Sequence, residues 1–495
     1  MTRKHKYLLF IILGISFSLS FCFSPPYDLM RDDREVFSYA GMAILKGQVP
    51  YRDFFDHKPP GIFFINAAGS LLGGLWGLWA INTLLVLIAT WMLYRICLQY
   101  RLAFSWLLPL LFNLMIRDNL ISMGASMTRE FTTIFFLFFF CIFMGRSRYR
   151  EMSLGLCTGL IFFTQQEQVL ATVPFLLYVL AAERSLPINQ RIARMALGFG
   201  AVLVPILLYF AWNRSLGYLW DDGFRFNMIW YTAQPKSPGD HFRTIKRCLD
   251  AGNYEMPFMI ALILGVASFF TKHKKKGLLL TALAAFFLSL APELMGNRFE
   301  GRANPIDSPP YFLPLAASIC ALLFVIFAFS DEAIIGDKKI QLPFALLLLC
   351  SLTYTSLQHS THLEKRSDDS DINSPALNYL RQHRPGNYDL YVFNDDDYIY
   401  AYNEFGILAP SRWIYHHMWD WYYRWDADHA LLSGITADLL RHHTTYIIMD
   451  PVRMTQFLNP ANTAYWRDFM EKNYEPQPVP GTRILWKRKE TPPNR

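Results

Sequence analysis

The chain contains 495 residues, of which 53% are hydrophobic, 16% aromatic and only 18% charged. A soluble protein of this size rarely contains such a high proportion of apolar residues, so the composition favours a polytopic membrane protein. The formal net charge of +7 does not indicate nucleic-acid binding, because the basic residues stand at the ends of apolar runs and not on one soluble domain.

The first apolar run covers residues 7–23 and follows the basic segment Arg3-Lys4-His5-Lys6. It is followed by Phe21-Cys22-Phe23-Ser24-Pro25, which contains no small-x-small cleavage site. An uncleaved first membrane span is therefore favoured over a signal peptide.

A polar loop rich in carboxylates follows, over residues 28–61, and is predicted to contain two short helices. The first begins at Asp32 or Asp33 and extends to about Lys46. Its apolar residues have the three-to-four spacing of a helix that lies in the membrane interface: Val36, Phe37, Ala40 and Ile44. The second begins at Pro59-Pro60, because proline suits the first helical turn.

Three acids stand at the start of the first of these helices. Asp32 and Glu35 have the spacing of a capping box, which explains both without any catalytic role. Asp33 is left without a structural task.

Four short motifs follow one another in this loop: Asp33 with Val36-Phe37-Ser38-Tyr39, then Leu45-Lys46-Gly47, then Pro50-Tyr51-Arg52-Asp53, then Asp56-His57-Lys58-Pro59-Pro60-Gly61. Together they resemble the first external loop of GT-C glycosyltransferases, in the bacterial branch related to protein O-mannosyltransferases and to the aminoarabinose transferase of lipid A. Weaker similarity extends over the membrane region. The resemblance implies a polytopic α-helical catalytic fold and transfer with inversion at the sugar.

Further apolar runs predict ten more membrane spans, which with the first give about eleven. They lie near 76–97, 103–116, 128–145, 152–164, 166–182, 195–213, 256–271, 277–294, 310–329 and 341–357. The shorter runs require tilted or kinked helices, because a straight span needs roughly 20 residues.

Basic residues recur in alternate loops between these runs. They are Arg95 and Arg101; Arg146, Arg148 and Arg150; Arg184, Arg191 and Arg194; Lys272, Lys274, Lys275 and Lys276; Lys338 and Lys339. The positive-inside rule places them in the cytoplasm with the N-terminus. The opposite side then receives the loops 28–61, 214–255 and 295–309 and the C-terminal region, and an error of one span would break this assignment.

The chain divides by composition into a membrane domain, 1–357, and a C-terminal region, 358–495, that is predicted to be a small extracytoplasmic α/β domain. Strands are expected at 388–393 and 445–449. Helices are expected at 374–383, 427–442 and 462–472, and such alternation indicates an α/β fold.

The first candidate site residues lie in the 28–61 loop. Asp33 can serve as the general base that deprotonates an acceptor hydroxyl, and the resemblance aligns it with the catalytic acid of the family. A helix cap or a solvated charge is the alternative. Lys58 can contact the phosphate of a lipid donor, or it is an interfacial lysine that reaches lipid headgroups. Asp56 orients Lys58 or a bound sugar, or it is an ordinary loop acid.

Other candidates for substrate binding are Asp32, Glu130, Arg298 and Arg302. Relatives often carry an acid at the position of Glu130, and the alternative is a first-turn acid that favours the helix dipole and pairs with Arg129. The two arginines can bind a phosphate or lipid headgroups. Relatives also carry a lysine near 165–167 and a histidine before Tyr311, and this chain has neither.

Two features suggest a metal without making a convincing site. Asp395-Asp396-Asp397 follows a predicted strand but is better explained as a turn. The pairs His416-His417 and His442-His443, with His359 and His362, form poor chelates, because adjacent residues of a strand point to opposite faces. The seven cysteines have the spacing of neither a zinc site nor a disulfide framework. No metal is required for the proposed chemistry, although a divalent ion is possible.

The sequence thus predicts a membrane glycosyltransferase of the cell envelope, multi-pass in the inner or plasma membrane. It moves a sugar from a polyprenyl-phosphate carrier to a hydroxyl of a glycan, lipid or protein. One alternative is a transporter or flippase of lipid-linked sugars, which an inverted repeat would have favoured. Another is a polysaccharide ligase or polymerase with a pyrophosphate-linked donor.

Overall fold

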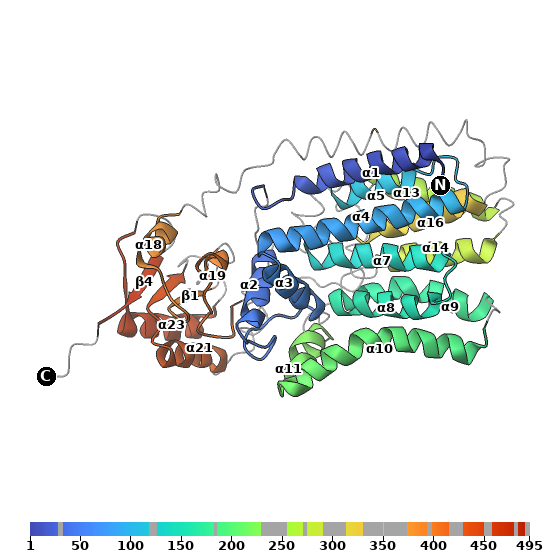
Figure 1. Ribbon diagram of the computed structural model, residues 1–495. Coiled ribbons are helices and arrows are strands. Elements are labelled where there is room, and N and C mark those ends of the chain that lie inside the picture. The colour runs from blue at the N-terminus through green and yellow to red at the C-terminus, as the bar shows by residue number, and fades with distance from the viewer. Residues whose placement is uncertain are drawn as a thin grey trace.

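The structure is a computed structural model that describes most of the chain. The described residues are 1–27, 33–117, 126–182, 186–228, 255–270, 275–290, 313–329, 350, 374–393, 398–414, 429–449, 458–479 and 484–490. A bundle of helices forms the larger part of the molecule, and a smaller part with a sheet and short helices lies at one end of it (Figure 1). The N-terminus lies at the other end of the bundle.

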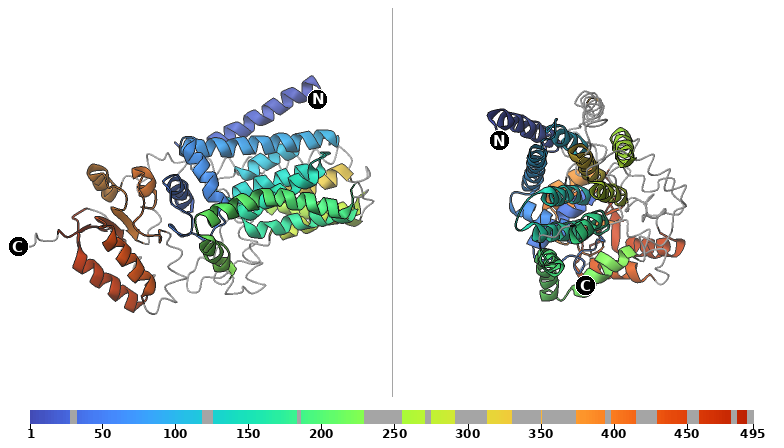
Figure 2. Two further views of the ribbon diagram at one scale, coloured as in Figure 1. Left: turned by 60° about the horizontal axis from the view of Figure 1, so that its bottom comes forward. Right: turned by 90° about the vertical axis from the view of Figure 1, so that its right-hand side faces the viewer.

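The bundle contains helices of very different length. They are α1 (Arg3–Phe21), α2 (Asp33–Leu45), α3 (Gly61–Leu71), α4 (Leu75–Gln99), α5 (Leu107–Ile116), α7 (Thr128–Met144), α8 (Arg150–Thr164), η1 (Gln166–Thr172), α9 (Val173–Ala182), α10 (Ile188–Trp212), α11 (Leu216–Trp220), η2 (Asp221–Arg225), α13 (Glu255–Phe270), α14 (Lys276–Leu288) and α16 (Leu315–Phe329). The longer helices run along the bundle, whereas α2 and α3 lie across its end (Figures 1 and 2).

Three helices of the described chain are long and apolar enough to cross a membrane by themselves: α1, α4 and α10. Several other predicted spans form shorter helices. For example, α5 has 10 residues and extends about 15 Å, about half of a hydrocarbon core of roughly 30 Å. The last predicted span, 341–357, lies outside the described residues except for Cys350. The count of eleven spans therefore stays a prediction.

Close helix packing depends on small residues, as is usual in membrane proteins. A Cβ atom on Gly155 of α8 would lie 1.9 Å from the carbonyl oxygen of Met195, and one on Gly198 of α10 would lie 1.9 Å from that of Met152. These two glycines therefore allow the backbones of α8 and α10 to approach each other.

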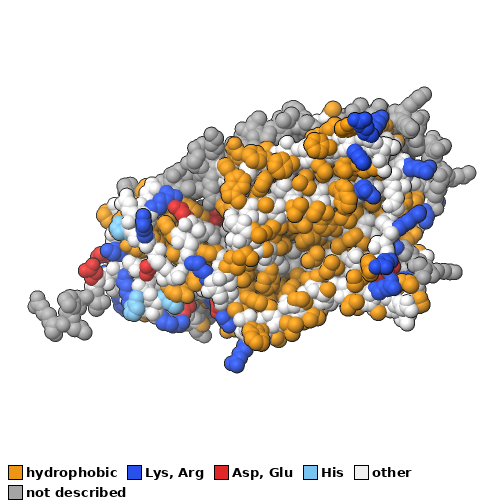
Figure 3. Space-filling view, in the orientation of Figure 1, with side chains coloured by type: hydrophobic (Ala, Val, Ile, Leu, Met, Phe, Trp, Pro, Cys, Tyr) orange, Lys and Arg blue, Asp and Glu red, His pale blue; other side chains and the backbone are white. Residues whose placement is uncertain are grey.

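Basic side chains gather at the end of the bundle that holds the N-terminus, and apolar side chains cover the flank of the bundle (Figure 3). Arg95, Arg101 and Ser147 line one cavity with the first residues of the chain. Arg194 donates to the carbonyl of Arg148 at 3.2 Å. These basic loops thus share one end, as the predicted topology requires, while the side of the membrane that this end faces stays a prediction.

The smaller part contains a four-stranded sheet in the order β1-β2-β4-β3. The strands are β1 (Leu390–Phe393), β2 (Tyr446–Met449), β3 (Tyr474–Pro476) and β4 (Ile484–Arg488), and the helices are α18 (Pro375–His383), α19 (Tyr400–Phe405), α21 (Ala430–Arg441) and α23 (Pro460–Asn473). β1 and β2 are parallel with Leu390 opposite Tyr446, and β4 is antiparallel to both its neighbours. The ring of Phe393 stacks on Trp466 at 4.1 Å in the core between sheet and helices.

The strands expected at 388–393 and 445–449 are found as β1 and β2, and the three expected helices as α18, α21 and α23. The sequence reading missed β3, β4 and α19. The proposed domain boundary between residues 357 and 358 lies outside the described residues.

The predicted helices of the first loop are α2 and α3. α2 begins at Asp33, and α3 begins at Gly61 with Pro60 as its N-cap residue, one position after the predicted prolines. The apolar face of α2 is buried inside the protein, since Val36, Phe37 and Ala40 are at most 1% exposed. These three residues therefore pack against α3 and the rest of the protein and do not face lipid. The position of α2 relative to the membrane stays a prediction.

Candidate active site

Asp33 and Lys58 meet at the end of the bundle that lies next to the smaller part. Asp33 is the first residue of α2, and Lys58 stands three residues before α3. The Lys58 Nζ lies 3.7 Å from Asp33 Oδ2, and the two side chains are 14% and 15% exposed. The fold therefore brings together a carboxylate and an ammonium that the sequence separates by a helix and a loop.

The backbone of Lys58 is fixed on both sides. Its N–H donates to Asp56 Oδ1 at 2.9 Å, and its carbonyl accepts from the hydroxyl of Tyr51 at 2.7 Å. Tyr51 is completely buried. The Nζ of Lys58 lies 3.1 Å from Nε2 of His57. These contacts define where the ammonium group can lie.

Asp56 is a buried carboxyl of this loop, only 1% exposed. Burial raises its pKa to about 7, against the lowering effect of the nearby Lys58, and the charge of Asp33 raises it further. An ordinary loop acid also makes such a hydrogen bond to the backbone two residues further on, so the orientation of Lys58 by Asp56 stays a prediction.

Glu35 is held by the smaller part of the molecule. Its Oε2 accepts from Nδ2 of Asn403 at 2.7 Å, and its backbone carbonyl accepts from the same group at 3.0 Å. The residue is 2% exposed. Its expected capping partner, Asp32, lies outside the described residues.

Glu130 lies in the first turn of α7 and is completely buried. Its Oε1 lies 2.5 Å from Nη1 of Arg117, and its Oε2 accepts from the backbone N–H of Ser126. Arg117 also donates to Ser20 at 3.1 Å and to Asn82 at 2.7 Å. The sequence reading had weighed Arg129 as the partner of Glu130 and missed Arg117, whose signal is a single arginine directly after an apolar run.

The remaining predicted residues and both metal-like clusters lie wholly or partly outside the described chain. Arg298, Arg302, His416, His417 and the aspartates 395–397 all do. Of the paired histidines, His442 and His443 are described, and they follow the end of α21 instead of lying in a strand as assumed from the sequence. The ring of His442 stacks on Tyr388 at 4.3 Å. Within the described residues, no group of three or more His, Cys, Asp or Glu side chains is placed to hold a metal.

A segment of the smaller part, residues 403–412, contacts both α2 and the loop before α3. The backbone N–H of Phe55 donates to the carbonyl of Arg412 at 2.8 Å, and the N–H of Ala409 donates to the hydroxyl of Tyr39 at 3.0 Å. Lys46 donates to the carbonyl of Gly406. No sequence pattern indicated these contacts, because they join residues more than 350 positions apart.

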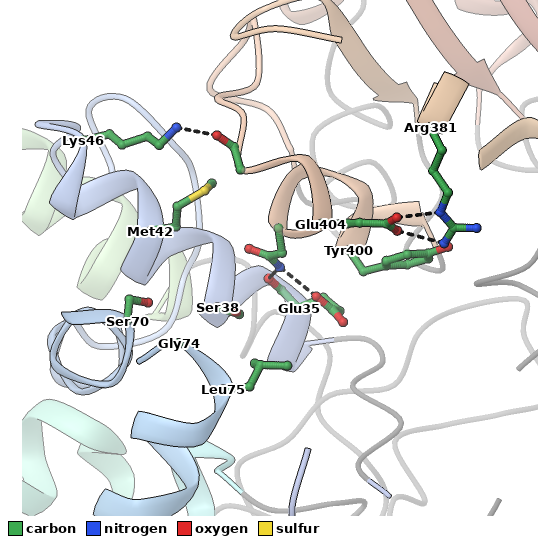
Figure 4. A pocket seen from close by; sticks show the side chains of 12 residues that line it. Glu35, Ser38, Met42, Lys46, Ser70, Gly74, Leu75, Arg381, Tyr400 and Glu404 are labelled. Atoms are coloured by element: carbon green, nitrogen blue, oxygen red, sulfur yellow. Dashed lines mark hydrogen bonds and ion pairs between the residues drawn. The ribbon is translucent and has the colours of Figure 1, made fainter. Parts of the chain in front are cut away.

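A cavity of about 580 Å³ lies beside this segment (Figure 4). α2 contributes Glu35, Ser38 and Met42 to its lining, and the smaller part contributes Tyr400 and the ion pair of Arg381 with Glu404. Figure 4 also shows the contacts of Lys46 and Glu35 with the smaller part.

The long apolar helices fit a polytopic membrane protein, to which a smaller part with a sheet is joined. No family model and no curated protein matches the sequence. Among solved structures, the chain is similar to the crystal structure of ArnT from Cupriavidus metallidurans bound to undecaprenyl phosphate. The TM-score is 0.60 and the identity 12%, over 96% of this chain and 97% of that one. This likeness shows that the chain has an overall fold similar to that of this protein.

Proposed function

We propose that the protein is a membrane glycosyltransferase that transfers a sugar from a polyprenyl-phosphate carrier to an acceptor hydroxyl. The main observation in support of this proposal is that Asp33 and Lys58 lie 3.7 Å apart at one end of the bundle. The fold is similar to that of a protein whose crystal structure contains undecaprenyl phosphate. A carboxylate next to a cation provides the two functions that this reaction needs, a base for the acceptor and a counter-charge for the leaving phosphate.

The transfer is a single displacement. Asp33 takes the proton of the acceptor hydroxyl while the acceptor oxygen forms a bond to the anomeric carbon. The bond between that carbon and the phosphate oxygen breaks, and its electron pair leaves with the polyprenyl phosphate. Attack from the face opposite the leaving group inverts the anomeric centre. Lys58 neutralises the charge that develops on the phosphate.

Because Lys58 also contacts Asp33, binding of the donor to Lys58 affects the basicity of Asp33. A donor phosphate that binds Lys58 competes with Asp33 for the ammonium, because both are anions. Binding of the donor then leaves Asp33 better able to accept a proton. The enzyme would thus activate its base only when the sugar is in place.

The other candidate residues have roles in the same proposal. Arg298 and Arg302 assist Lys58 at the phosphate, and Asp32 contributes to the substrate site. Glu130, which is buried in its pair with Arg117, contributes to that site only through the structure. A phosphate leaving group can depart without a metal-bound pyrophosphate, so the reaction requires no metal. The acceptor is a glycolipid, a polysaccharide or a protein on the outer face of the inner or plasma membrane.

The test uses the purified chain in lipid nanodiscs with radiolabelled polyprenyl-phosphate sugars and candidate acceptors from the cell envelope. Transfer of label that Asp33→Asn abolishes supports the proposal. In sealed vesicles, movement of the labelled lipid across the bilayer without transfer would instead support the flippase. Unchanged transfer in the presence of EDTA would agree with a metal-free reaction.

The proposed orientation has its own test. A reporter fused after Lys276 should report the cytoplasm and one fused at the C-terminus the outer side, because the basic loops alternate along the chain. Reporters that indicate the same side would refute the outer placement of the smaller part.

A further inference from the structure

The backbone that presents Lys58 is held by two segments that are far away in the sequence. The N–H of Phe55 donates to the carbonyl of Arg412 at 2.8 Å. The carbonyl of His57 accepts from Nδ2 of Asn227 at 2.6 Å. One hydrogen bond therefore comes from the segment 403–412 and the other from the helical segment 216–228.

These two segments are joined to each other by an ion pair between Arg412 and Asp222. Asp222 is 5% exposed, and burial raises its pKa to about 6 in spite of the favourable effect of Arg412. Without Arg412, this carboxylate would be buried and uncompensated, which is costly. The pair therefore keeps the segments 403–412 and 216–228 at a fixed separation on either side of the loop.

The guanidinium of Arg412 is also enclosed by aromatic rings. Its Cζ lies 4.6 Å from the ring centre of Trp413, 5.2 Å from that of Tyr218 and 5.8 Å from that of Phe55. Phe55 stacks on Trp413 with ring centres 5.3 Å apart. Cation–π contacts of this kind restrict the side chain further, so that Arg412 holds the loop through its backbone, its charge and its packing.

The same segment holds the helix that carries Asp33. Asn403 donates to Glu35, Lys46 donates to Gly406, and Tyr39 accepts from Ala409; Figure 4 shows the first two of these contacts. The segment 403–412 is thus attached to α2 on one side and to the Lys58 loop on the other. It fixes the relative position of the two candidate groups.

We propose that Arg412 is a positioning residue for Lys58. It acts through its carbonyl on Phe55, and through Asp222 on the segment whose Asn227 holds His57. The guanidinium does not bind the phosphate itself, because Asp222 and three aromatic rings already occupy it. This inference rests on the proposed function in one respect, the contact of Lys58 with a lipid phosphate.

The experiment measures the affinity of the full-length purified protein in nanodiscs for undecaprenyl phosphate, which requires no knowledge of the sugar. Lys58→Ala should weaken binding by about 10- to 100-fold, as loss of a hydrogen bond to a charged group does. Arg412→Gln and Asp222→Asn should each weaken it by about tenfold. Arg412→Lys keeps the ion pair and should restore part of the loss. Lys472→Gln, which breaks an exposed ion pair with Asp468 within α23, is the matched control and should bind normally.

The double variant Lys58→Ala/Arg412→Gln separates positioning from direct contact. If Arg412 acts through Lys58, the double variant binds no more weakly than Lys58→Ala alone. Losses that multiply in full would mean that Arg412 acts independently of Lys58 and would overturn the inference. Normal binding by both Arg412→Gln and Asp222→Asn, with a normal effect of Lys58→Ala, would overturn it too. Normal binding by Lys58→Ala would refute the proposed phosphate contact as well.

A second measurement does not depend on the lipid. Amide hydrogen exchange of a peptide covering residues 55–58 should become faster in Arg412→Gln and in Asp222→Asn, because their hydrogen bonds are loosened. The control Lys472→Gln should exchange like the parent. Unchanged exchange in both variants would contradict the positioning role even if binding were weakened.

Discussion

Two ion pairs in this molecule each join a carboxylate to a basic side chain, but they lie in different surroundings. Arg117 and Glu130 are 2.5 Å apart, each side chain is 1% exposed, and Arg117 also donates to Ser20 and Asn82. Lys58 and Asp33 are 3.7 Å apart and about one seventh exposed. Arg117 and Glu130 are thus enclosed by their hydrogen-bond partners. Lys58 and Asp33 are farther apart and partly exposed, so another charged group can reach them and replace one partner.

The difference has an energetic consequence. Two charged groups that are buried together lose their hydration, and only their close contact with each other compensates for that loss. Removal of one partner is therefore costly, because the other charge stays buried without compensation. A partly exposed pair contributes little, typically below about 1 kcal/mol. An incoming phosphate can therefore take Lys58 from Asp33 at small cost, but it cannot take Arg117 from Glu130. This comparison supports the proposed catalysis by Lys58 and Asp33, and it favours a structural task for the pair of Arg117 and Glu130.

The largest effect is expected at Asp33. Loss of a positioned base lowers the rate by about 100- to 10,000-fold, so Asp33→Asn should abolish most transfer and still bind undecaprenyl phosphate through Lys58. The measurement is the initial rate per folded molecule at saturating donor, together with the affinity for the lipid. Asp32→Asn is the neighbouring control and should keep substantial activity. An inactive Asp32→Asn beside an active Asp33→Asn would show that the base is the neighbour.

A comparably large effect on stability is expected at the enclosed pair of Arg117 and Glu130. Arg117→Met leaves the carboxylate of Glu130 buried without its partner and should reduce the free energy of unfolding by about 3–5 kcal/mol. The double variant Arg117→Met/Glu130→Leu removes both charges and should recover much of this loss. The measurement is thermal unfolding in one detergent or nanodisc. Normal unfolding of Arg117→Met with a large loss of transfer would instead place Arg117 and Glu130 in the substrate site.

The sequence predicted the parts of this picture that depend on local patterns. Apolar periodicity gave α2, proline gave the start of α3 to within one or two positions, and the motifs gave Asp33 and Lys58 as candidates. The contacts of Arg412 with the loop before α3 join residues more than 350 positions apart in the sequence. A local sequence pattern contains no information about such distant contacts. Burial of the apolar face of α2 was misjudged for the same reason, since a face turned to lipid and a face turned to protein have the same composition.

A smaller effect is expected in the pH dependence of stability, through the carboxyl group of Asp56. Its pKa is raised from 3.8 to about 7 in the folded protein, so the unfolded chain loses this proton first as the pH rises. The contribution of Asp56 to stability therefore falls between about pH 4 and pH 7, by at most about 1.4 kcal/mol per pH unit, and is constant above that window. Asp56→Asn can still accept from Lys58 and should flatten this part of the curve. The check is the unfolding temperature of both proteins from pH 5 to pH 8; identical slopes would refute the assignment.

The smallest effect is expected at Glu35, which shares the first turn of α2 with Asp33. Its carboxylate accepts a hydrogen bond from Asn403 at 2.7 Å, and an amide oxygen can accept the same bond, so Glu35→Gln should change the free energy of unfolding by about 1 kcal/mol or less. Transfer should stay close to that of the parent, because the interaction holds α2 to the smaller part and takes no proton from the acceptor. Glu35→Ala removes the bond and leaves the partly buried amide of Asn403 without this partner. It should therefore unfold at a lower temperature with a similar rate per folded molecule. A fully folded Glu35→Gln that transfers no sugar would show that the base is Glu35 and that the pair of Asp33 with Lys58 is only a part of the scaffold.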